Sequence, residues 1–395
     1  MGVIERIGRY LTGNTIGRLR YRNNGLWVFG EWFGNRCCDN SLFFANYLAE
    51  QHPEIPCIWV SKKGTDLSLL NPRIKRVEQG SEAMGLICNA ACIIVNQSTE
   101  DVSSENGFSI SGPTIINLWH GIPWKKIGFE AFKGNSLLIK AWLYYLMIRK
   151  STSYWLSLNA EFTEVFKKGF GAKEESIIRA GYPRNMEFYN EEKIAGRRDE
   201  LLEHLKIPER FGSRDVKIIT YMPTFRDHKD QAFSFDSIAG DEAFQRILGK
   251  YNAVIIQKAH FAEHNKEGKS NSGRIFAEND YPAALLLAAT DILITDYSSC
   301  FFDYLLLDRP IIHYLYDYDY YRNQDRGLYY PKEEVVCGDA PENVTDLLKS
   351  LEANLENPGK DAELRKKRRE RFMAYESADS CEKIFRAITA GKQTV

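Results

Sequence analysis

Short apolar runs alternate along the first half of the chain with segments whose apolar residues recur at helical spacing. This alternation is typical of a parallel α/β sheet, because the chain usually returns to start the next parallel strand through a helix. We therefore expect an α/β domain at residues 1–205. The pattern predicts its strands at residues 26–29, 57–60, 73–77, 92–95, 114–118, 154–158 and 177–180, and its helices at 41–50, 81–91, 159–168 and 191–205.

The alternation resumes after a polar linker at residues 206–215. A chain of 395 residues also exceeds the size at which one hydrophobic core keeps growing. We expect a second α/β domain at residues 206–395 with a helical C-terminus, whose last helix can pack back on the first domain. Its predicted strands are residues 216–221, 253–258, 275–276, 291–295 and 311–315, and its predicted helices are 241–248, 281–289, 300–307, 341–355 and 360–390.

The most informative pattern lies between residues 289 and 331. A buried strand ends in the polar turn 296–299, a helical run follows, and the next strand comes after it. The N-terminus of a helix at the carboxyl end of a strand favours a phosphate or pyrophosphate. Ser298 and Ser299 are therefore candidate phosphate ligands. The alternative is that Ser298 only caps its own helix.

The segment after this last strand, residues 316–331, combines six tyrosines with Asp317, Arg322 and Arg326. The pattern predicts a polar loop at the carboxyl end of a strand. Binding residues often lie on loops in such positions, because the sheet holds them in place. The composition of this loop therefore favours a ligand-binding surface.

His120 follows another buried strand, within the sequence WHGIPWKK at residues 119–126. A lone histidine is more often structural than catalytic. Here it lies at a strand end, in a backbone shaped by Gly121 and Pro123, with Lys125 and Lys126 close by. A neutral imidazole can take a proton from an attacking hydroxyl, and either lysine can hold a phosphate.

Two more loops carry arginines suited to a phosphate. Arg226 and Asp227 come shortly after the strand at 216–221, and Arg184 lies in the turn GYPRN at residues 181–185. A guanidinium can donate two parallel hydrogen bonds to one phosphate. The alternative for Arg226 and Asp227 is an ion pair on the surface, which contributes little to stability.

Composition narrows the class of protein. The net charge of −1 gives no overall attraction to nucleic acid, so no nucleic-acid partner is expected. The eight cysteines lack zinc-ligand spacing, and no signal peptide or spanning segment is recognisable, which favours the cytoplasm. Asp317 and Asp319 imitate a metal-binding DxD motif, but a helix N-terminus, Arg and His can neutralise a pyrophosphate instead. We predict no cofactor and no metal.

Two segments are candidates for membrane contact. Residues 1–22 mix apolar side chains with arginines, and residues 136–150 are strongly apolar, with Lys140, Arg149 and Lys150 as their basic residues. The second segment is too short to span a bilayer. Each is interpreted either as an interfacial helix on anionic lipid or as a packing helix. The basic run at 366–371 is interpreted as a solvated face.

Taken together, the motifs WHGIPWK, GYPRN, PTFRD, TDYSS and RGLYY closely resemble those of the glycerophosphotransferases that use CDP-glycerol to build teichoic acid and capsule polymers. The resemblance implies a GT-B-like fold, with two Rossmann-like doubly wound domains facing across a cleft. It implies transfer of glycerol phosphate from CDP-glycerol to a membrane-associated glycan or lipid-linked acceptor, with release of CMP, by a peripheral enzyme on the cytoplasmic face of the cell membrane.

The resemblance also distributes roles. It implies that His120 is catalytic and that His260, just beyond the strand at 253–258, is a second functional histidine. The expected donor-binding residues are Pro223, Thr224, Arg226, Asp227, Ser298, Ser299, Asp317 and Arg326, and the phosphate or acceptor candidates are Lys125, Lys126 and Arg184. The alternatives are a CDP-ribitol-dependent transferase, a GT-B glycosyltransferase using a nucleotide sugar, and a non-catalytic nucleotide-binding module.

Overall fold

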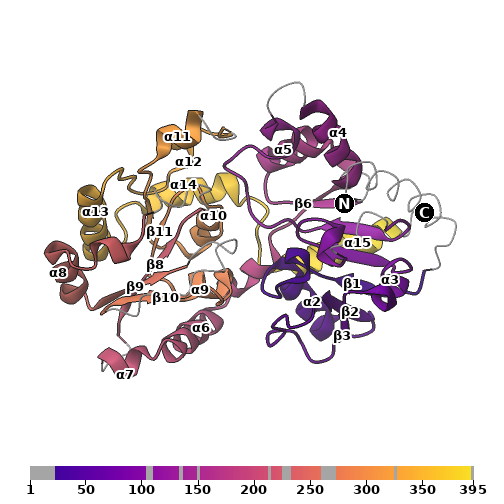
Figure 1. Ribbon diagram of the computed structural model, residues 1–395, viewed down its shortest axis with the longest axis horizontal. Helices are drawn as coiled ribbons and strands as arrows, with labels where there is room; N and C mark the ends of the chain where they lie inside the picture. Colours follow the sequence, from indigo (N-terminus) through magenta and orange to yellow (C-terminus); the bar gives the residue numbers. More distant parts are fainter. Residues whose placement is uncertain are drawn as a thin grey trace. The chain divides into compact units, whose positions relative to one another are not determined.

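The computed structural model describes residues 23–103, 110–132, 137–148, 152–211, 215–224, 233–258, 273–323 and 327–392. These residues form two compact units, each built on a parallel sheet (Figure 1). The first unit takes its parts from Met1–His120, Ile127–Met186 and Tyr375–Val395, and the second from Gly121–Lys126 and Glu187–Ala374. The main passage between the units thus lies between Met186 and Glu187, whereas the sequence placed a boundary at 205/206.

The first unit contains a seven-stranded parallel sheet in the order β3-β2-β1-β4-β5-β6-β7. The strand order reverses between β1 and β4, which is where doubly wound sheets bind ligands at the carboxyl edge. The strands are β1 (Trp27–Phe29), β2 (Cys57–Ser61), β3 (Lys75–Glu78), β4 (Cys92–Val95), β5 (Thr114–Asn117), β6 (Tyr154–Ser157) and β7 (Ile177–Arg179).

Helices of the first unit bury the apolar residues of this sheet. Ala83 and Ile87 of α3 pack with Val28, Ile93 and Ile115 of three neighbouring strands in one core cluster. The C-terminal helix belongs to this unit, so the chain returns to it after leaving for the second. Its helices are α2 (Asn40–Gln51), α3 (Ser81–Ile87), α4 (Leu137–Ile148), α5 (Ala160–Phe170) and α15 (Ser380–Lys392).

The second unit repeats the design with five parallel strands in the order β10-β9-β8-β11-β12. The order reverses between β8 and β11. Helices α8 and α13 share one core cluster with alternate residues of these strands, and α9 contacts β8 as well as α6. The strands are β8 (Lys217–Met222), β9 (Ala253–Gln257), β10 (Ile275–Ala277), β11 (Ile292–Thr295) and β12 (Ile311–His313).

The helices of the second unit are α6 (Glu191–His204), α7 (Ile207–Phe211), α8 (Glu242–Lys250), α9 (Ala283–Ala289), α10 (Cys300–Tyr304), α11 (Tyr318–Asn323), α12 (Lys332–Val335), α13 (Val344–Glu356) and α14 (Ala362–Phe372). The α/β class, the parallel strands and the helical C-terminus are confirmed. No helix in the described ranges is long and apolar enough to cross a membrane.

Two segments predicted as irregular contain helices. The predicted linker 206–215 includes α7, whose Ile207 is fully buried and whose Phe211 packs on Phe276. The predicted loop 316–331 includes α11, because the ring of Tyr321 is buried 4.1 Å from that of Tyr297. In both cases one or two aromatic or aliphatic side chains, held by tertiary packing, decide the local structure.

The prediction of a solvated face at residues 366–371 is wrong for Arg368. Its guanidinium is buried and donates to the carbonyl oxygens of Val336 and Glu333, at 3.2 and 2.5 Å. Lys366 and Lys367 are exposed, as predicted. Burial of an arginine is tolerated here because carbonyl acceptors replace water.

Candidate functional site

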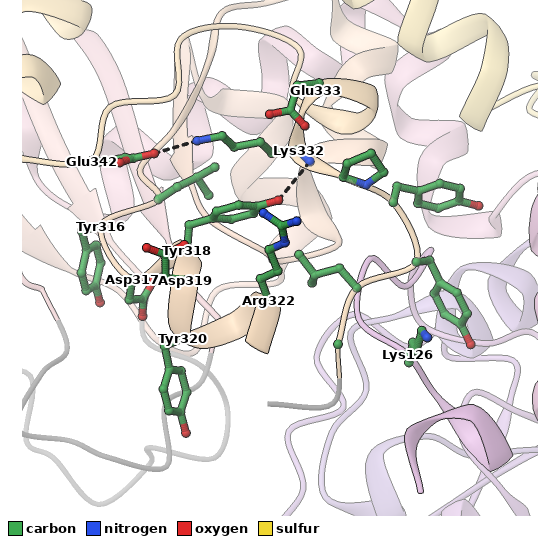
Figure 2. A pocket seen from close by; sticks show the side chains of 16 residues that line it. Lys126, Tyr316, Asp317, Tyr318, Asp319, Tyr320, Arg322, Lys332, Glu333 and Glu342 are labelled. Carbon is green, nitrogen blue, oxygen red and sulfur yellow. Dashed lines mark hydrogen bonds and ion pairs between the residues drawn. The ribbon is translucent and has the colours of Figure 1, made fainter. Parts of the chain in front are cut away.

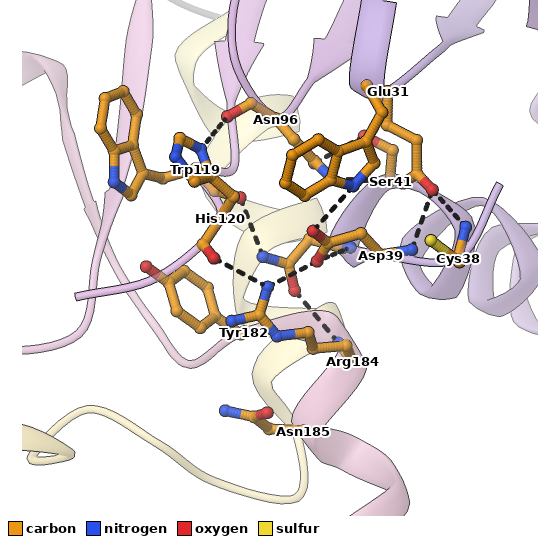
Figure 3. Close-up of polar contacts among 12 residues, drawn as sticks. Glu31, Cys38, Asp39, Ser41, Asn96, Trp119, His120, Tyr182, Arg184 and Asn185 are labelled. Atoms are coloured by element: carbon orange, nitrogen blue, oxygen red, sulfur yellow. Dashed lines mark hydrogen bonds and ion pairs between the residues drawn. The ribbon is translucent and has the colours of Figure 1, made fainter. Parts of the chain in front are cut away.

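The site in the first unit is built around the backbone that follows β5 (Figure 3). Trp119 has a φ of +59°, a left-handed conformation that costs a bulky residue about 1–3 kcal/mol. Its N–H donates to the side chain of Asn117 at 2.9 Å, and its carbonyl accepts from Asn40 Nδ2 at 3.0 Å. These bonds fix the direction in which His120 leaves the sheet.

The imidazole of His120 is fixed by two further contacts. Its Nδ1 lies 3.2 Å from the carbonyl oxygen of Asn96, and its ring stacks on that of Trp119 at 4.7 Å. A carbonyl only accepts, so Nδ1 must carry the hydrogen, and Nε2 of the neutral ring keeps a lone pair. Burial lowers the pKa of His120, and the carbonyl of Asn96 opposes this shift. The geometry therefore provides a neutral imidazole with one nitrogen able to accept a proton.

Arg184 lies beneath this backbone and is almost completely buried. Its Nη1 donates to Asp39 Oδ1 at 2.5 Å and to the carbonyl oxygen of His120 at 3.2 Å. The guanidinium also lies over the ring of Tyr182, at 4.7 Å. These contacts direct the charge of Arg184 to a carboxylate of the protein, and its role as a phosphate or acceptor ligand stays a prediction.

Two more buried carboxylates, Glu31 and Asp101, support the loops on either side. Glu31 accepts from the N–H groups of Cys38 and Asp39 and from Asn96 Nδ2, and burial raises its pKa well above the usual range. Asp101 accepts from the N–H groups of Phe33, Asn96 and Gln97; burial raises its pKa to about 7, while these bonds lower it. Both acids therefore hold the backbone around His120 in place.

In the second unit, the ends of β8 and β11 are joined by Asp296 at the point where the strand order reverses. Its carboxylate accepts from the N–H and the hydroxyl of Thr224, at 2.8 and 2.7 Å, and from the N–H of Ser298 at 3.2 Å. Pro223 precedes Thr224 in the same loop. Helix α10 starts at Cys300 with Ser299 as its N-cap, and the Ser299 side chain makes no capping bond. The alternative in which Ser298 caps the helix is not what the structure shows.

The segment just after His120 runs along this same turn of the second unit. A Cβ on Gly121 would lie 2.2 Å from the Ser299 hydroxyl oxygen, so any other residue would require Ser299 or the loop to shift. Trp124 is buried against Tyr297 and donates from Nε1 to the carbonyl oxygen of Tyr330 at 2.9 Å. The loop therefore brings the lysines at 125 and 126 to the tyrosine-rich segment.

A pocket of about 620 Å³ opens beside that segment (Figure 2). Lys126 and Asp317, both predicted from sequence, line it together with Arg322, and Tyr297 donates from its hydroxyl to Asp317 at 3.1 Å. Lys125 instead lies over the ring of Tyr321, at 5.0 Å. The remaining lining consists of Leu315, Tyr316, Tyr318, Asp319, Tyr320, Gly327, Leu328, Tyr329, Tyr330, Pro331, Lys332, Glu333 and Glu342.

Residues 16–390 match the sequence profile of the family described as CDP-Glycerol:Poly(glycerophosphate) glycerophosphotransferase. The chain belongs to this family. A teichoic acid glycerol-phosphate transferase of Staphylococcus aureus is 28% identical over 96% of this chain and 96% of its own length. A teichoic acid poly(glycerol phosphate) polymerase of Bacillus spizizenii is 34% identical over 62% of this chain and 60% of its own length.

Among solved structures, that of the wall teichoic acid polymerase TagF superposes with a TM-score of 0.80 and 26% identity, covering 99% of this chain and 94% of that one. This match confirms the GT-B-like α/β fold. The matched relatives also include a teichoic acid ribitol-phosphate polymerase of Staphylococcus aureus. The names of these relatives thus include both polyols, glycerol and ribitol.

Several predicted site residues of this family member lie outside the described residues, namely Arg226, Asp227, His260 and Arg326, as does the segment 1–22. Sequence reasoning assigned no role to Glu31, Asp39, Asn40, Asn96 or Asp101. Only their location in the sequence could have marked them as site residues, because each lies after the end of a strand or in the next helical segment. Within the described ranges, no group of three His, Cys, Asp or Glu side chains is arranged to hold a metal.

Proposed function

We propose that this family member transfers glycerol phosphate from CDP-glycerol to a hydroxyl of a membrane-associated glycan or lipid-linked acceptor and releases CMP. The observation that carries the proposal is the state of His120, whose Nδ1 is bonded to the Asn96 carbonyl so that Nε2 is left as a base. The family implies that CDP-glycerol is the donor, and the geometry of His120 supplies a general base for the reaction. An acceptor hydroxyl has a pKa far above neutrality, so its attack on phosphorus requires a base nearby.

In this mechanism the acceptor oxygen attacks the phosphorus that carries glycerol. The new P–O bond forms as the bond to the CMP oxygen breaks, and CMP leaves with that electron pair. The hydroxyl proton passes to Nε2 of His120, which becomes an imidazolium while Nδ1 stays bonded to Asn96. Charge spreads over the phosphoryl oxygens and the departing CMP, so fixed donors there lower the barrier more than covalent chemistry does.

The donor is assigned to the second unit. Ser299 has a hydroxyl that makes no capping bond, and Ser298 and Thr224 are held by the one carboxylate of Asp296. Lys126 and the other polar residues of the adjoining pocket offer cations and hydroxyls for the rest of the donor. His260, Arg226 and Arg326 are proposed to stabilise the charge that moves onto CMP.

Acceptors of the proposed kind reside at a membrane, and α4 offers a surface suited to one. Leu138 and Ile139 are each 69% exposed and Trp142 is 59% exposed, while Lys140 is exposed beside them. Exposed apolar side chains next to a cation are typical of helices that lie at a bilayer surface. We therefore assign the protein to the cytoplasmic face of the membrane, bound peripherally.

The experiment is a donor comparison. Purified protein is incubated with labelled CDP-glycerol, CDP-ribitol and common nucleotide sugars, and the released nucleotide is identified. We expect CMP from CDP-glycerol, because the bond broken lies within the pyrophosphate. Release of a nucleoside diphosphate would mean that a glycosidic bond is broken and would overturn the proposal. Faster CMP release from CDP-ribitol would reassign the polyol.

The same assay tests the role of His120. His120→Ala should lower turnover by roughly a hundredfold or more, the usual range for a lost acid–base group, with CDP-glycerol affinity nearly intact. Ser299→Ala is the matched comparison, because it should weaken donor binding as well. Loss of donor binding by His120→Ala, with the fold intact, would make His120 a donor ligand instead of the base.

A further inference from the structure

We propose that the buried ion pair between Asp39 and Arg184 positions His120 as the general base. The inference rests on the proposed function, because it presupposes that His120 takes the acceptor proton. It concerns residues that do not themselves touch substrate. Asp39 and Arg184 are therefore positioning residues, which act through the backbone and the electrostatics of His120.

The geometry shows why His120 needs such support. The φ of +59° at Trp119 is one that a bulky L-residue keeps only when its surroundings over-determine it. Asn117 and Asn40 hold the peptide groups of Trp119, at 2.9 and 3.0 Å. Arg184 is the group that holds the next carbonyl, that of His120 itself, at 3.2 Å. Without Arg184, the carbonyl group of His120 would lose this buried donor.

Asp39 in turn fixes Arg184. The two side chains are each 9% exposed, and Asp39 Oδ1 accepts from Arg184 Nη1 at 2.5 Å. The same carboxylate accepts from the N–H of Asn40 at 2.7 Å and from Trp32 Nε1 at 3.2 Å. The N–H of Arg184 also donates to Asn40 Oδ1 at 3.3 Å. One carboxylate at the start of α2 thus ties together the arginine and the asparagine that hold the Trp119–His120 backbone.

The pair also acts on the charge state of the imidazole. Burial is the main cause that lowers the pKa of His120; beyond the Asn96 carbonyl, Asp39 raises that pKa and Arg184 lowers it. Behind Asp39 lie the buried acids Glu31 and Asp101, which are bonded to backbone N–H groups. Because the two charges of the pair oppose each other, they leave the effect of burial in place, and burial favours the neutral base. Removing either charge alone should move its pKa, in opposite directions.

The test uses CDP-glycerol turnover, its KM and the pH dependence of kcat/KM. Arg184→Gln should lower kcat by roughly tenfold to a hundredfold, as expected for a misplaced catalytic group, and leave KM for CDP-glycerol within about twofold. Its acid limb should move to higher pH, because a cation that disfavours the imidazolium is gone. Arg184→Lys keeps the charge and a donor, so it should recover most of the turnover and the acid limb of the unmodified protein.

Asp39→Asn should move the acid limb to lower pH. Because it leaves a buried cation unpaired and can impair folding, Asp39→Asn/Arg184→Gln is measured beside it, with circular dichroism and thermal unfolding as folding checks. The double variant restores neutrality, so its acid limb should return towards that of the unmodified protein while its kcat stays low. These opposite shifts would not follow from a merely structural role.

His120→Asn distinguishes a failure of the proposed base from a failure of the positioning role. If it retains full turnover, the proposed role of His120 fails, and the positioning role fails with it. If it is inactive while Arg184→Gln keeps both the kcat and the acid limb of the unmodified protein, only the positioning role is overturned. If Arg184→Gln raises the KM for CDP-glycerol with kcat unchanged, Arg184 is a substrate ligand and the positioning role is likewise overturned.

Discussion

At the scale of single residues, position 121 is among the most sterically restricted in the proposed site. Its φ is +155°, and a Cβ there would lie 2.2 Å from the hydroxyl oxygen of Ser299 and 2.7 Å from its Cβ. This contact puts the residue that follows His120 directly against the proposed donor-binding turn of the second unit. A methyl group at position 121 can be accommodated only if Ser299 or the loop moves.

Gly121→Ala should therefore weaken CDP-glycerol binding. Overpacking costs about 1–3 kcal/mol, and about 1.4 kcal/mol corresponds to tenfold in affinity, so we expect a loss of roughly tenfold in titration calorimetry. Gly64→Ala is the matched control, because Gly64 also has a positive φ, of +83°, but has open space around its Cβ position. Equal donor affinity in both variants would show that Ser299 does not contact the donor.

At the scale of elements, the second unit depends on the connection between the ends of β8 and β11. The described loop residues that follow these two strands have no regular structure. Asp296 joins the two loops by accepting hydrogen bonds from the N–H and hydroxyl of Thr224 and from the N–H of Ser298. A carboxylate can accept several such bonds at once, whereas an amide offers a single accepting oxygen. The two loops thus share one acceptor at the switch point of the sheet.

Asp296→Asn should accordingly lower the free energy of unfolding of the protein by about 2 kcal/mol, the usual worth of hydrogen bonds to a charged group. Donor affinity should fall with it, since Ser298 and Thr224 lose their common partner. Urea unfolding and calorimetric titration with CDP-glycerol measure the two effects. Asp280→Asn, an exposed aspartate in the same unit, should change neither quantity. Unchanged stability in Asp296→Asn would mean that the turn is held by other contacts.

At the same scale, the elements differ in how well the sequence predicted them. Most strands of both sheets were predictable because buried parallel strands read as continuous apolar runs, and Cys92–Val95 has the predicted bounds. His120, Ser299 and Lys126 were proposed as site residues because they lie in loops that follow strands, and their roles stay predictions. Asn40 and Arg184 were not assigned to the His120 backbone, since the bond between them joins residues 144 positions apart and leaves no local pattern. Helix α11 was missed because its anchor is the distant ring of Tyr297.

At the scale of the whole molecule, the chain does not complete one unit before starting the other. It passes between them after His120, after Lys126, after Met186 and after Ala374. The first passage comes directly after the proposed base, and the excursion Gly121–Lys126 adds Trp124 to the core of the second unit, where it is 1% exposed. Residues 375–395 belong to the first unit, where Glu376 accepts from the N–H of Tyr182 at 2.9 Å. The segments that carry site residues are thus tied to both cores.

The last prediction concerns the proposed binding of the whole molecule to a membrane through α4. Leu138 and Trp142 are four residues apart and share one helix face, and both are largely exposed, at 69% and 59%. Burying such side chains in a bilayer surface removes apolar area from water, and Lys140 adds attraction to anionic lipid. Leu138→Asp/Trp142→Asp should therefore reduce co-flotation of the protein with anionic vesicles several-fold.

Donor affinity should be unaffected in this variant, because the proposed donor-binding residues belong to other elements. Tyr189→Asp is the control, since Tyr189 is also an exposed aromatic residue, at 43%, but lies outside α4. Binding of the unmodified protein should weaken with added salt without vanishing, because salt screens the attraction of the basic residues and leaves the apolar contribution in place. If the double variant floats as well as the unmodified protein, α4 is not the membrane contact, and the exposed apolar face needs another partner.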